Sequence, residues 1–476
     1  MFFRQVFEPK LAQYAYIVGC QRTGEAIVVD PQRDINRYVD IAKEEGLTIT
    51  AVTETHIHAD YLSGAREFAE QHDVKLYLSD EGDEDWKYFW AQNGDYNFIP
   101  LKHEDVFKVG NIEFKVIHSP GHTPEHISFM ITDLGGGADE PIGMLSGDFV
   151  FVGDLGRPDL LESAAGQEGA REPSARRLYE SVQSFLTLPE YLQIWPGHGA
   201  GSACGKALGA IPETTVGYEK RFNMSIRAAI EGQDQFVASI LDGQPEPPLY
   251  FARMKHDNKH GPAILGKIPR PIKIKKERLE FMSQWDQYVV VDCRMDRSAF
   301  MKKHIPGAIY APLDNTFPTV TGSYIDPDVP IYLILDREED VETAVLDLVR
   351  IGLDKIVAYA LPSVTNEMPS ATIEEIDISE MERARSLPGT SVLDVRRQSE
   401  FDASHVPDAQ NIAHTRLLAR LDELDKDATH FIHCRSGARA AVAAALLKNK
   451  GFDVVYVNGN YADWAAEHAE AASVTA

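Results

Sequence analysis

The C-terminal part of the chain contains one pattern of motifs twice, about 100 residues apart. In each copy an apolar run ends in an Asp-x-Arg triplet, at 292–294 and again at 394–396. A His-x-Pro motif follows in both copies, at 304–306 and 405–407. Self-similarity at a fixed offset indicates repeated structural units. We therefore predict two tandem copies of a small α/β domain.

The N-terminal part has a different organisation. Short apolar runs alternate with helical patterns, which is typical of a mixed α/β domain. A basic segment with Pro262, Pro269 and Pro271 then interrupts an otherwise acidic chain, as expected for an extended connector. We predict a domain at 1–260, a basic linker at 261–280, and the two repeat copies at 281–365 and 372–476.

The composition of the chain argues against several kinds of partner and several kinds of protein. The net charge is -26, from 47 basic and 73 acidic residues, which disfavours nucleic acid and anionic membranes as partners. No apolar run approaches the roughly 18 residues that span a bilayer, and the N-terminus does not have the pattern of a signal peptide. The four cysteines are far apart, which argues against a disulfide framework. We expect a cytoplasmic protein.

A group of histidines and acids in the N-terminal part has the pattern of a metal site. His56 and His58 follow a β-rich run, and residues i and i+2 at a strand end point to the same side. The alternative is a set of turn residues with isolated structural histidines. The recurrence of such residues at four strand-to-loop junctions argues against it. The candidates in these four elements are His56, His58, Asp60, Tyr61, His122, Asp148 and His198.

A loop in the second repeat copy has the features of a thiolate site. It lies between an apolar strand and an Ala-rich helix predicted at 440–448. Such a loop turns backbone N–H groups inward, and the helix N-terminus adds positive potential. Gly437 permits the tight backbone path, and we expect Arg435 and Arg439 to add two cations. Cys434 is then an activated nucleophile rather than a buried structural thiol, with Ser436, Gly437 and Ala438 completing the cradle.

The first repeat copy lacks this nucleophile. Asp336 stands where the cysteine of the second copy stands, and the following residues up to Asp340 are largely acidic. This loop cannot form a thiolate and would repel anions. Cys293 lies at a strand end outside the loop, and we interpret it as structural. The first copy is therefore predicted to be catalytically silent.

The N-terminal motifs resemble the metallo-β-lactamase superfamily. The resemblance implies two β-sheets between helices, with metal at the loop edge. The usual final histidine of the HxHxDH motif is replaced by Tyr61, which favours one metal over two. Within the superfamily, segments 1–9, 56–60, 119–124, 147–148 and 153–159 are most similar to persulfide dioxygenases. That similarity implies that His56, His122 and Asp148 bind one Fe(II) per chain.

The remaining N-terminal candidates take supporting roles under this resemblance. His58, Asp60, Tyr61 and His198 would orient the ligands. Arg157 would neutralise an anionic substrate, the alternative being an ion pair with Asp154 or Asp159. Cys204 lies in a loop beside Lys206 and would carry sulfane sulfur, the alternative being a cysteine without catalytic importance.

The loop of Cys434, with segments 394–396 and 400–407, is similar to rhodaneses. The whole chain thus resembles bacterial persulfide dioxygenase–rhodanese fusions. The implied fold is α/β: a metallo-β-lactamase αββα sandwich followed by two rhodanese-like domains. The implied activity oxidises a low-molecular-weight thiol persulfide with O2 to sulfite, and interconverts persulfide plus sulfite with thiosulfate through Cys434. Such proteins serve sulfide detoxification, and homo-oligomers are expected.

Two rival functions remain at this point. The first is a dinuclear zinc thioesterase resembling glyoxalase II, fused to a sulfur carrier, which Tyr61 disfavours. The second is a sulfur carrier or sensor without catalysis. The sequence leaves open the thiol that carries the persulfide, whether glutathione, coenzyme A or bacillithiol, and the direction of sulfur flow.

Overall fold

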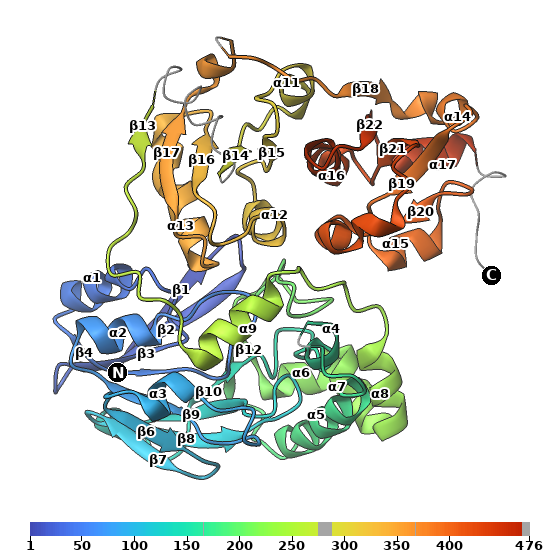
Figure 1. Ribbon diagram of the computed structural model, residues 1–476. Coiled ribbons are helices and arrows are strands. Elements are labelled where there is room, and N and C mark those ends of the chain that lie inside the picture. Colours follow the sequence, from blue (N-terminus) through green and yellow to red (C-terminus); the bar gives the residue numbers. More distant parts are fainter. Residues whose placement is uncertain (165, 275–287, 367, 469–476) are drawn as a thin grey trace. The chain divides into compact units, whose positions relative to one another are not determined.

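The computed structural model describes residues 1–164, 166–274, 288–366 and 368–468. It divides into two compact units (Figure 1). The first comprises Met1–Lys267 with Val349–Gly352, and the second Ile268–Leu348 with Leu353–Ala476. Parts of all four predicted segments lie outside the described residues: 165 of the N-terminal domain, 275–280 of the linker, 281–287 of the first copy and 469–476 of the second.

The first unit contains two six-stranded sheets. The first sheet has the order β1 (Phe2–Glu8), β2 (Gln13–Cys20), β3 (Glu25–Val29), β4 (Thr48–Thr53), β5 (Lys75–Ser79) and β6 (Phe98–Leu101). The second has the order β12 (Thr214–Thr215), β11 (Gln193–Pro196), β10 (Gly143–Gly147), β9 (Ile127–Asp133), β8 (Ile112–His118) and β7 (Val106–Val109).

Apolar side chains explain why these sheets pack face to face. On β8 the buried residues alternate with partly exposed ones, so one face of that strand enters the core. Every residue of β2 is buried, because both of its faces are covered. One core cluster joins residues of both sheets, including Val18, Val29, Phe114 and Trp195.

Helices cover the outer faces, as the resemblance implied, so the predicted αββα sandwich is confirmed. The core on the outside of the first sheet includes Tyr38 of α1 and Phe68 of α2, and the core on the outside of the second includes Leu178 of α5 and Phe236 of α8. Helices α5, α7 and α8 lie together (Figure 1). The helices are α1 (Asn36–Glu44), α2 (Ala65–Gln71), α3 (Phe89–Asn93), α4 (Leu160–Ser163), α5 (Arg171–Phe185), α6 (Val216–Phe222), α7 (Met224–Glu231), α8 (Gln233–Leu241) and α9 (Phe251–His260).

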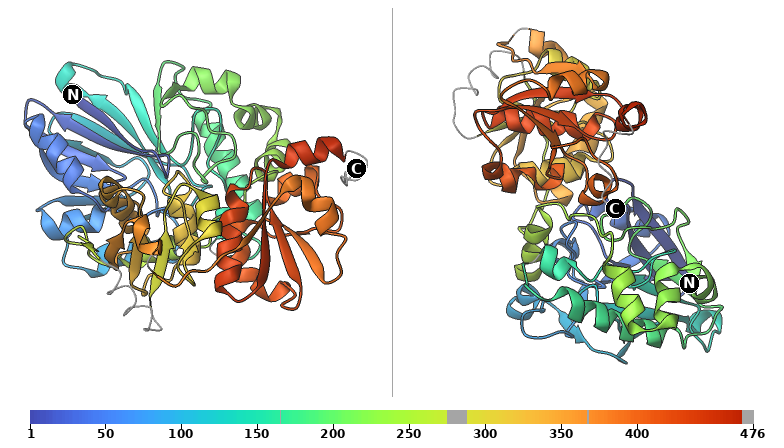
Figure 2. Two further views of the ribbon diagram at one scale, coloured as in Figure 1. Left: turned by 90° about the horizontal axis from the view of Figure 1, so that it is seen from above. Right: turned by 90° about the vertical axis from the view of Figure 1, so that its right-hand side faces the viewer.

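The second unit contains two parallel sheets with equivalent strand orders. The first copy has β13 (Ile272–Lys273), β17 (Ile356–Ala360), β16 (Ile331–Ile334), β14 (Val289–Asp292) and β15 (Ile309–Tyr310). The second has β18 (Glu374–Asp377), β22 (Asp453–Asn458), β21 (Thr429–His433), β19 (Thr390–Asp394) and β20 (Gln410–Asn411). Figure 2 shows the second copy in dark orange and red. The internal repeat is therefore a repeat of fold.

The helices of the second unit flank these sheets. They are α11 (Arg297–Lys302), α12 (Phe317–Tyr324), α13 (Val341–Arg350), α14 (Met381–Ala384), α15 (Gln398–Ala403), α16 (Ala438–Asn449) and α17 (Tyr461–Glu467), with a 3-10 segment at His414–Glu423. Part of the predicted linker is a strand, because β13 pairs with β17. Within the described residues, no helix combines the length and apolar character needed to cross a bilayer.

The Asp-x-Arg triplets form buried ion pairs that explain their recurrence. The guanidinium of Arg294 donates to both carboxylate oxygens of Asp292, at 2.8 and 2.7 Å, and to the carbonyl of Lys303 at 2.9 Å. Arg396 bonds in the same way to Asp394 and to the carbonyl of Ser404, at 2.7 Å. Each pair ties a strand end to the segment before the His-x-Pro motif.

We predict that Arg294→Ala destabilises the first copy strongly, since it leaves the buried Asp292 carboxylate without its partner. Loss of one member of a buried pair costs about 3–5 kcal/mol. Hydrogen exchange of the backbone amides of β14 and β16 at increasing urea concentration would measure the change in the free energy of unfolding. Arg337→Ala removes an exposed arginine paired with Asp340 and should leave this unfolding unchanged. Equal effects of the two substitutions would contradict this interpretation.

Candidate functional site

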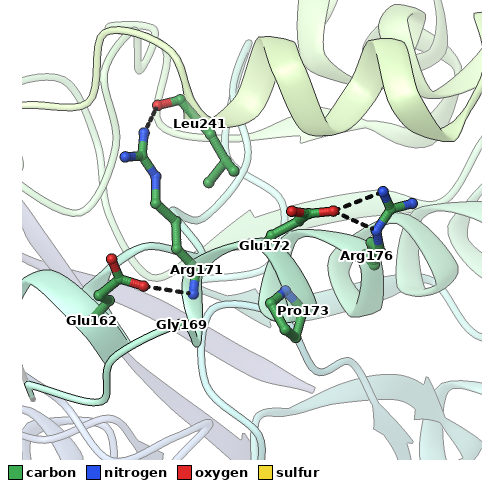
Figure 3. A pocket seen from close by; sticks show the side chains of 7 residues that line it. All are labelled: Glu162, Gly169, Arg171, Glu172, Pro173, Arg176 and Leu241. Atoms are coloured by element: carbon green, nitrogen blue, oxygen red, sulfur yellow. Dashed lines mark hydrogen bonds and ion pairs between the residues drawn. The ribbon is translucent and has the colours of Figure 1, made fainter.

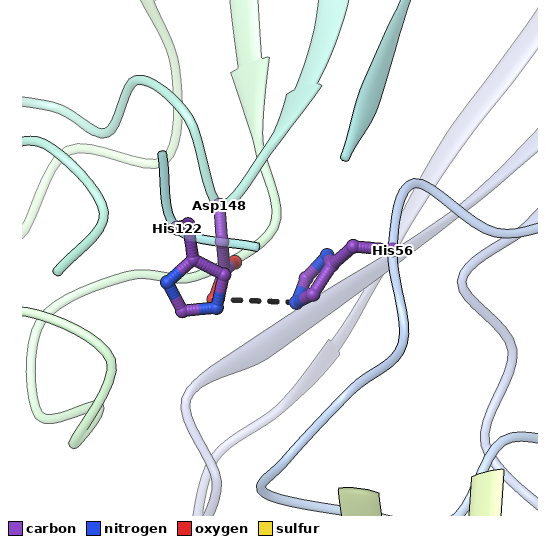
Figure 4. Close-up of side chains that lie close together, drawn as sticks. All are labelled: His56, His122 and Asp148. Atoms are coloured by element: carbon purple, nitrogen blue, oxygen red, sulfur yellow. Dashed lines mark ion pairs between the residues drawn. The ribbon is translucent and has the colours of Figure 1, made fainter. Parts of the chain in front are cut away.

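Three loops at one edge of the two sheets bring His56, His122 and Asp148 together (Figure 4). His56 follows β4, His122 follows β8, and Asp148 follows β10. The Oδ2 atom of Asp148 lies 3.8 Å from Nε2 of His56 and 3.6 Å from Nε2 of His122. All three side chains are buried, and one ligand atom from each lies within 4.8 Å of the others.

The donor atoms of this group fit a divalent metal ion. Within the described part of the chain, Oδ2 of Asp148 has no hydrogen-bond partner. The Nδ1 atom of His122 lies 3.1 Å from the carbonyl of Arg157, so a proton on Nδ1 leaves the lone pair of Nε2 directed at the carboxylate. Burial lowers the pKa of His122 to about 4, which keeps the imidazole neutral, as a metal ligand must be. Two histidines and one carboxylate are a ligand set for iron with open positions.

A second carboxylate, Asp30, orients both histidines of the first motif, and the sequence did not reveal it. Its Oδ1 accepts from the backbone N–H of Thr55 at 2.7 Å and lies 3.1 Å from Nε2 of His58. The hydroxyl of Thr55 donates to Oδ2 of Asp30 and lies 2.9 Å from Nδ1 of His56. His58 is therefore bonded to Asp30 through Nε2, which supports an orienting role. Asp30 comes after β3, far from the motif in sequence, so only tertiary pairing identifies it.

Residues after β8 and on α9 also hold the site and were missed. The ring of His126 accepts the N–H of Asp148 at 3.0 Å, which fixes the backbone of that ligand. The carboxylate of Glu125 accepts the N–H of Ile57 at 2.8 Å, between the two motif histidines. Asn258 donates to the carbonyl of His58 at 2.9 Å. His126 was detectable as a fourth residue after His122, but the pattern carried no indication of its partner.

Asp60, His198 and Cys204 form a second buried group whose ligand atoms also lie within 4.8 Å of one another. His198 bridges two carboxylates, with Nε2 at 2.8 Å from Asp60 and Nδ1 at 2.7 Å from Oδ1 of Asp148. Tyr61 is not a member of this group: its hydroxyl bonds to Gln13 and to the carbonyl of Asp30, and its ring packs against that of His58 with centroids 4.5 Å apart, which supports an orienting role.

The structure places Cys204 beside the metal group but does not activate it as expected. Burial and the negative charges of Asp60 and Asp148 raise the pKa of its thiol well above the ordinary value. The amine of Lys206 bonds to the carbonyls of Ser239 and Asp242, at 2.7 and 2.8 Å. Lys206 therefore does not supply the cation that the sequence suggested.

Arg157 forms the ion pair that the sequence offered as the alternative to substrate binding. Its guanidinium is 1% exposed and bonds to both oxygens of Asp159, at 2.9 and 2.7 Å. Two further bonds reach the carbonyls of Ala203 and Pro245, at 3.0 and 2.7 Å. These bonds favour a structural role, in which Arg157 ties together the loops around the metal group.

The loop from Cys434 joins β21 to α16, whose first residue is Ala438, two positions before the predicted start. The N–H of Ala440 donates to Sγ of Cys434 at 3.4 Å, so the first turn of the helix faces the thiol. Gly437 has φ +86°, and a Cβ there would approach Oδ1 of Asn458 to 2.6 Å. Glycine is therefore required both for the backbone conformation and for the close approach.

The two loop arginines are not equivalent. Arg439 donates to both carboxylate oxygens of Glu400, at 2.6 and 2.9 Å. Although burial opposes it, this pairing lowers the pKa of Glu400 to about 2, so the charge of Arg439 is matched at neutral pH. Arg439 is therefore a cation in the loop, as expected, but its hydrogen bonds go to Glu400. Arg435 is exposed at the surface of the loop.

The matching loop of the first copy contains no thiol. Asp336 follows β16, as Cys434 follows β21, and its carboxylate accepts the N–H of Met295 at 2.9 Å. Cys293 is buried, with Sγ 3.6 Å from the carbonyl of Val291. This geometry supports the prediction of a silent copy.

A surface hollow of about 650 Å³ lies beside α5 (Figure 3). The arginines that line it are bonded to neighbouring groups: Arg171 to the carbonyl of Leu241, and Arg176 to Glu172. None of the candidate residues lines it, and we assign it no function.

The fold and these groups define a metal-binding αββα domain joined to a domain with a cysteine loop. The metallo-beta-lactamase superfamily matches residues 9–198, and the rhodanese-like domain matches residues 377–467. A crystal structure of a metallo-beta-lactamase from Staphylococcus aureus subsp. aureus COL is 40% identical, with 76% of this chain and 98% of that chain covered and a TM-score of 0.66. The chain belongs to the metallo-beta-lactamase superfamily and carries a C-terminal rhodanese-like domain.

Two curated relatives are more distant. The Bos taurus mitochondrial persulfide dioxygenase ETHE1 is 27% identical over 41% of this chain and 67% of its own length. A beta-lactamase hydrolase-like protein from Xylella fastidiosa is 26% identical over 58% of this chain, which spans 63% of that protein's length. The names of the relatives therefore include both an oxygenase and hydrolases.

We predict that Asp30→Asn weakens metal binding by about 10- to 100-fold, because it disturbs the orientation of His56 and His58. Competition with a chelator, followed by metal analysis, measures this change. Asp40→Asn is the matched control, since Asp40 is an exposed carboxylate on α1. Unchanged affinity in Asp30→Asn would show that Asp30 does not orient the ligands.

Proposed function

We propose that the first unit is a mononuclear iron persulfide dioxygenase and that the rhodanese-like domain is a sulfurtransferase acting through Cys434. The buried group of His56, His122 and Asp148 is the observation that carries the first part. The bovine relative named a persulfide dioxygenase supports the substrate class. The reaction is RSSH + O2 + H2O giving RSH, SO3²⁻ and two protons.

The residues around the ligands define what the chain itself contributes. A ferrous ion held by His56, His122 and Asp148 would supply the redox state that O2 chemistry requires and zinc lacks. His198 occupies Oδ1 of Asp148 and leaves Oδ2 for a metal. The burial of all three ligands excludes bulk water from the site.

The proposed sulfurtransferase reaction has two steps. The Cys434 thiolate attacks the outer sulfur of RSSH, forming Cys434-SS⁻ and releasing RSH. Sulfite then attacks the outer sulfur of this persulfide, giving thiosulfate and restoring the thiolate. The N–H of Ala440 and the helix N-terminus stabilise negative charge at Cys434. Sulfite made in the first unit is thereby consumed in the second, although thiosulfate can drive the same steps in reverse.

The proposal extends to the cellular setting. The four cysteines are free, which suits a reducing compartment such as the cytoplasm. The substrates are a low-molecular-weight thiol persulfide, O2 and sulfite or thiosulfate, and the role is sulfide and persulfide detoxification. We propose a homo-oligomer on the basis of the resemblance.

Cys434→Ser separates the two activities. We expect the iron-loaded variant to consume O2 with glutathione persulfide at the rate of the unmodified protein, to accumulate sulfite, and to form thiosulfate only at the uncatalysed rate. An oxygen electrode and chromatography of sulfite and thiosulfate measure these quantities. Cys293→Ala removes the cysteine of the silent copy and should leave both products unchanged. Enzymatic thiosulfate formation in Cys434→Ser would refute the role of Cys434.

A dinuclear zinc hydrolase is the second candidate, and the group of Asp60, His198 and Cys204 favours it because a second ion could bind there. Metal analysis of the purified protein discriminates between them. We expect one iron per chain and O2 uptake with persulfide. Two zinc ions per chain with thioester hydrolysis would replace our proposal, and absence of O2 uptake by iron-loaded protein would favour a carrier or sensor.

A further inference from the structure

An arginine of the silent copy reaches the active loop of the second copy within the second unit. Arg297 is the first residue of α11, which follows β14 of the first copy. Its Nη2 donates to the carbonyl of Ser436 at 3.0 Å and to Oδ1 of Asn458 at 3.0 Å. Ser436 is the second residue after Cys434, so this contact is made with the catalytic loop itself.

A small network fixes the arginine in place. Oδ1 of Asn458 also accepts from the hydroxyl of Tyr456 at 2.9 Å, and its amide donates to Glu375 at 2.7 Å. The neighbour of Arg297 on α11, Ser298, donates to the same carboxylate oxygen of Glu375 at 2.9 Å. Both copies therefore supply residues to one network beside the loop.

This contact constrains the backbone of the loop. In a trans peptide the carbonyl and the following N–H point in opposite directions. By holding the carbonyl of Ser436, Arg297 fixes the N–H of Gly437 facing away from it. A Cβ on Gly437 would lie 3.3 Å from Nη2 of Arg297, so the arginine also packs closely against the loop.

Arg297 and Arg439 differ in the hydrogen-bond partners of their guanidinium groups. Arg439 is paired with a carboxylate, Glu400. The hydrogen bonds that the described residues give Arg297 go to a carbonyl and an amide oxygen. The side chain is partly exposed, and the carboxylate of Glu375 in this network bonds to Asn458 and Ser298. Arg297 therefore adds positive potential where an anion would approach Cys434.

We propose that Arg297 of the silent copy is a positioning residue of the Cys434 site, which fixes the Ser436 peptide and attracts the anionic sulfur acceptor or donor. The proposal rests on the sulfurtransferase function proposed above. It assigns the silent copy a direct part in the reaction of its neighbour.

Alkylation of Cys434 tests the charge independently of sulfurtransferase activity. Iodoacetate is an anion and iodoacetamide is neutral, and mass spectrometry of the Cys434 peptide gives both rates in the full chain. In Arg297→Gln we expect the iodoacetate-to-iodoacetamide rate ratio to fall about fivefold at low ionic strength. Lys302→Gln removes an exposed cation from the same helix and should leave the ratio unchanged. An unchanged ratio in Arg297→Gln overturns the electrostatic part.

Arg297→Lys tests positioning and remains informative if Arg297→Gln fails to fold. Lysine keeps the charge but lacks the planar fork of arginine. We expect the alkylation ratio to persist while kcat for sulfur transfer from thiosulfate to cyanide falls about tenfold. A wild-type kcat in Arg297→Lys overturns the positioning part. If the unmodified protein transfers no sulfur, the sulfurtransferase proposal fails, whereas the alkylation ratio still decides the role of the charge.

Discussion

The buried carboxylate of Asp148 is the constraint on which the first unit depends. A carboxylate without exposure must be compensated by hydrogen bonds, opposite charge or a metal ion. His198 compensates Oδ1, while Oδ2 faces the Nε2 atoms of His56 and His122. His126 holds the backbone of this carboxylate, Asp30 orients His56 through Thr55, and the carbonyl of Arg157 bonds to His122. A metal ion held by these three ligands would complete the balance of charge.

In the second unit both copies contain the same buried ion pair, whereas only the second copy has a cysteine in the loop after its central strand. In both copies an arginine is paired with the aspartate that ends a central strand, and the pair holds the next segment. The two copies differ at the loop that follows the neighbouring strand, where one has Asp336 and the other Cys434. The fold does not require a thiol in this loop, because the buried ion pairs and apolar strands that stabilise it lie elsewhere.

Local sequence predicted the site residues that belong to recognisable motifs. His56, His122, Asp148 and Cys434 each lie in a loop after an apolar run; the structure brings the first three together, and Cys434 lies between β21 and α16. The supporting residues could not be predicted, because Asp30 and Asn258 reach the site only through tertiary folding. The pairing of Arg439 with Glu400, 39 residues apart, was missed for the same reason. The strand β13 within the predicted linker was not foreseen, because a two-residue strand depends on its partner β17.

The position of Arg297 has a consequence for how the chain can be divided into functional fragments. The loop of the first copy contains a carboxylate where the second copy has a thiol, but Arg297 of the first copy bonds to the loop of the second. Under the role proposed for Arg297, the first copy contributes to the site of the second. If Arg297 has the role proposed above, a sulfurtransferase fragment of this chain has to include the first copy and cannot begin at the start of the second.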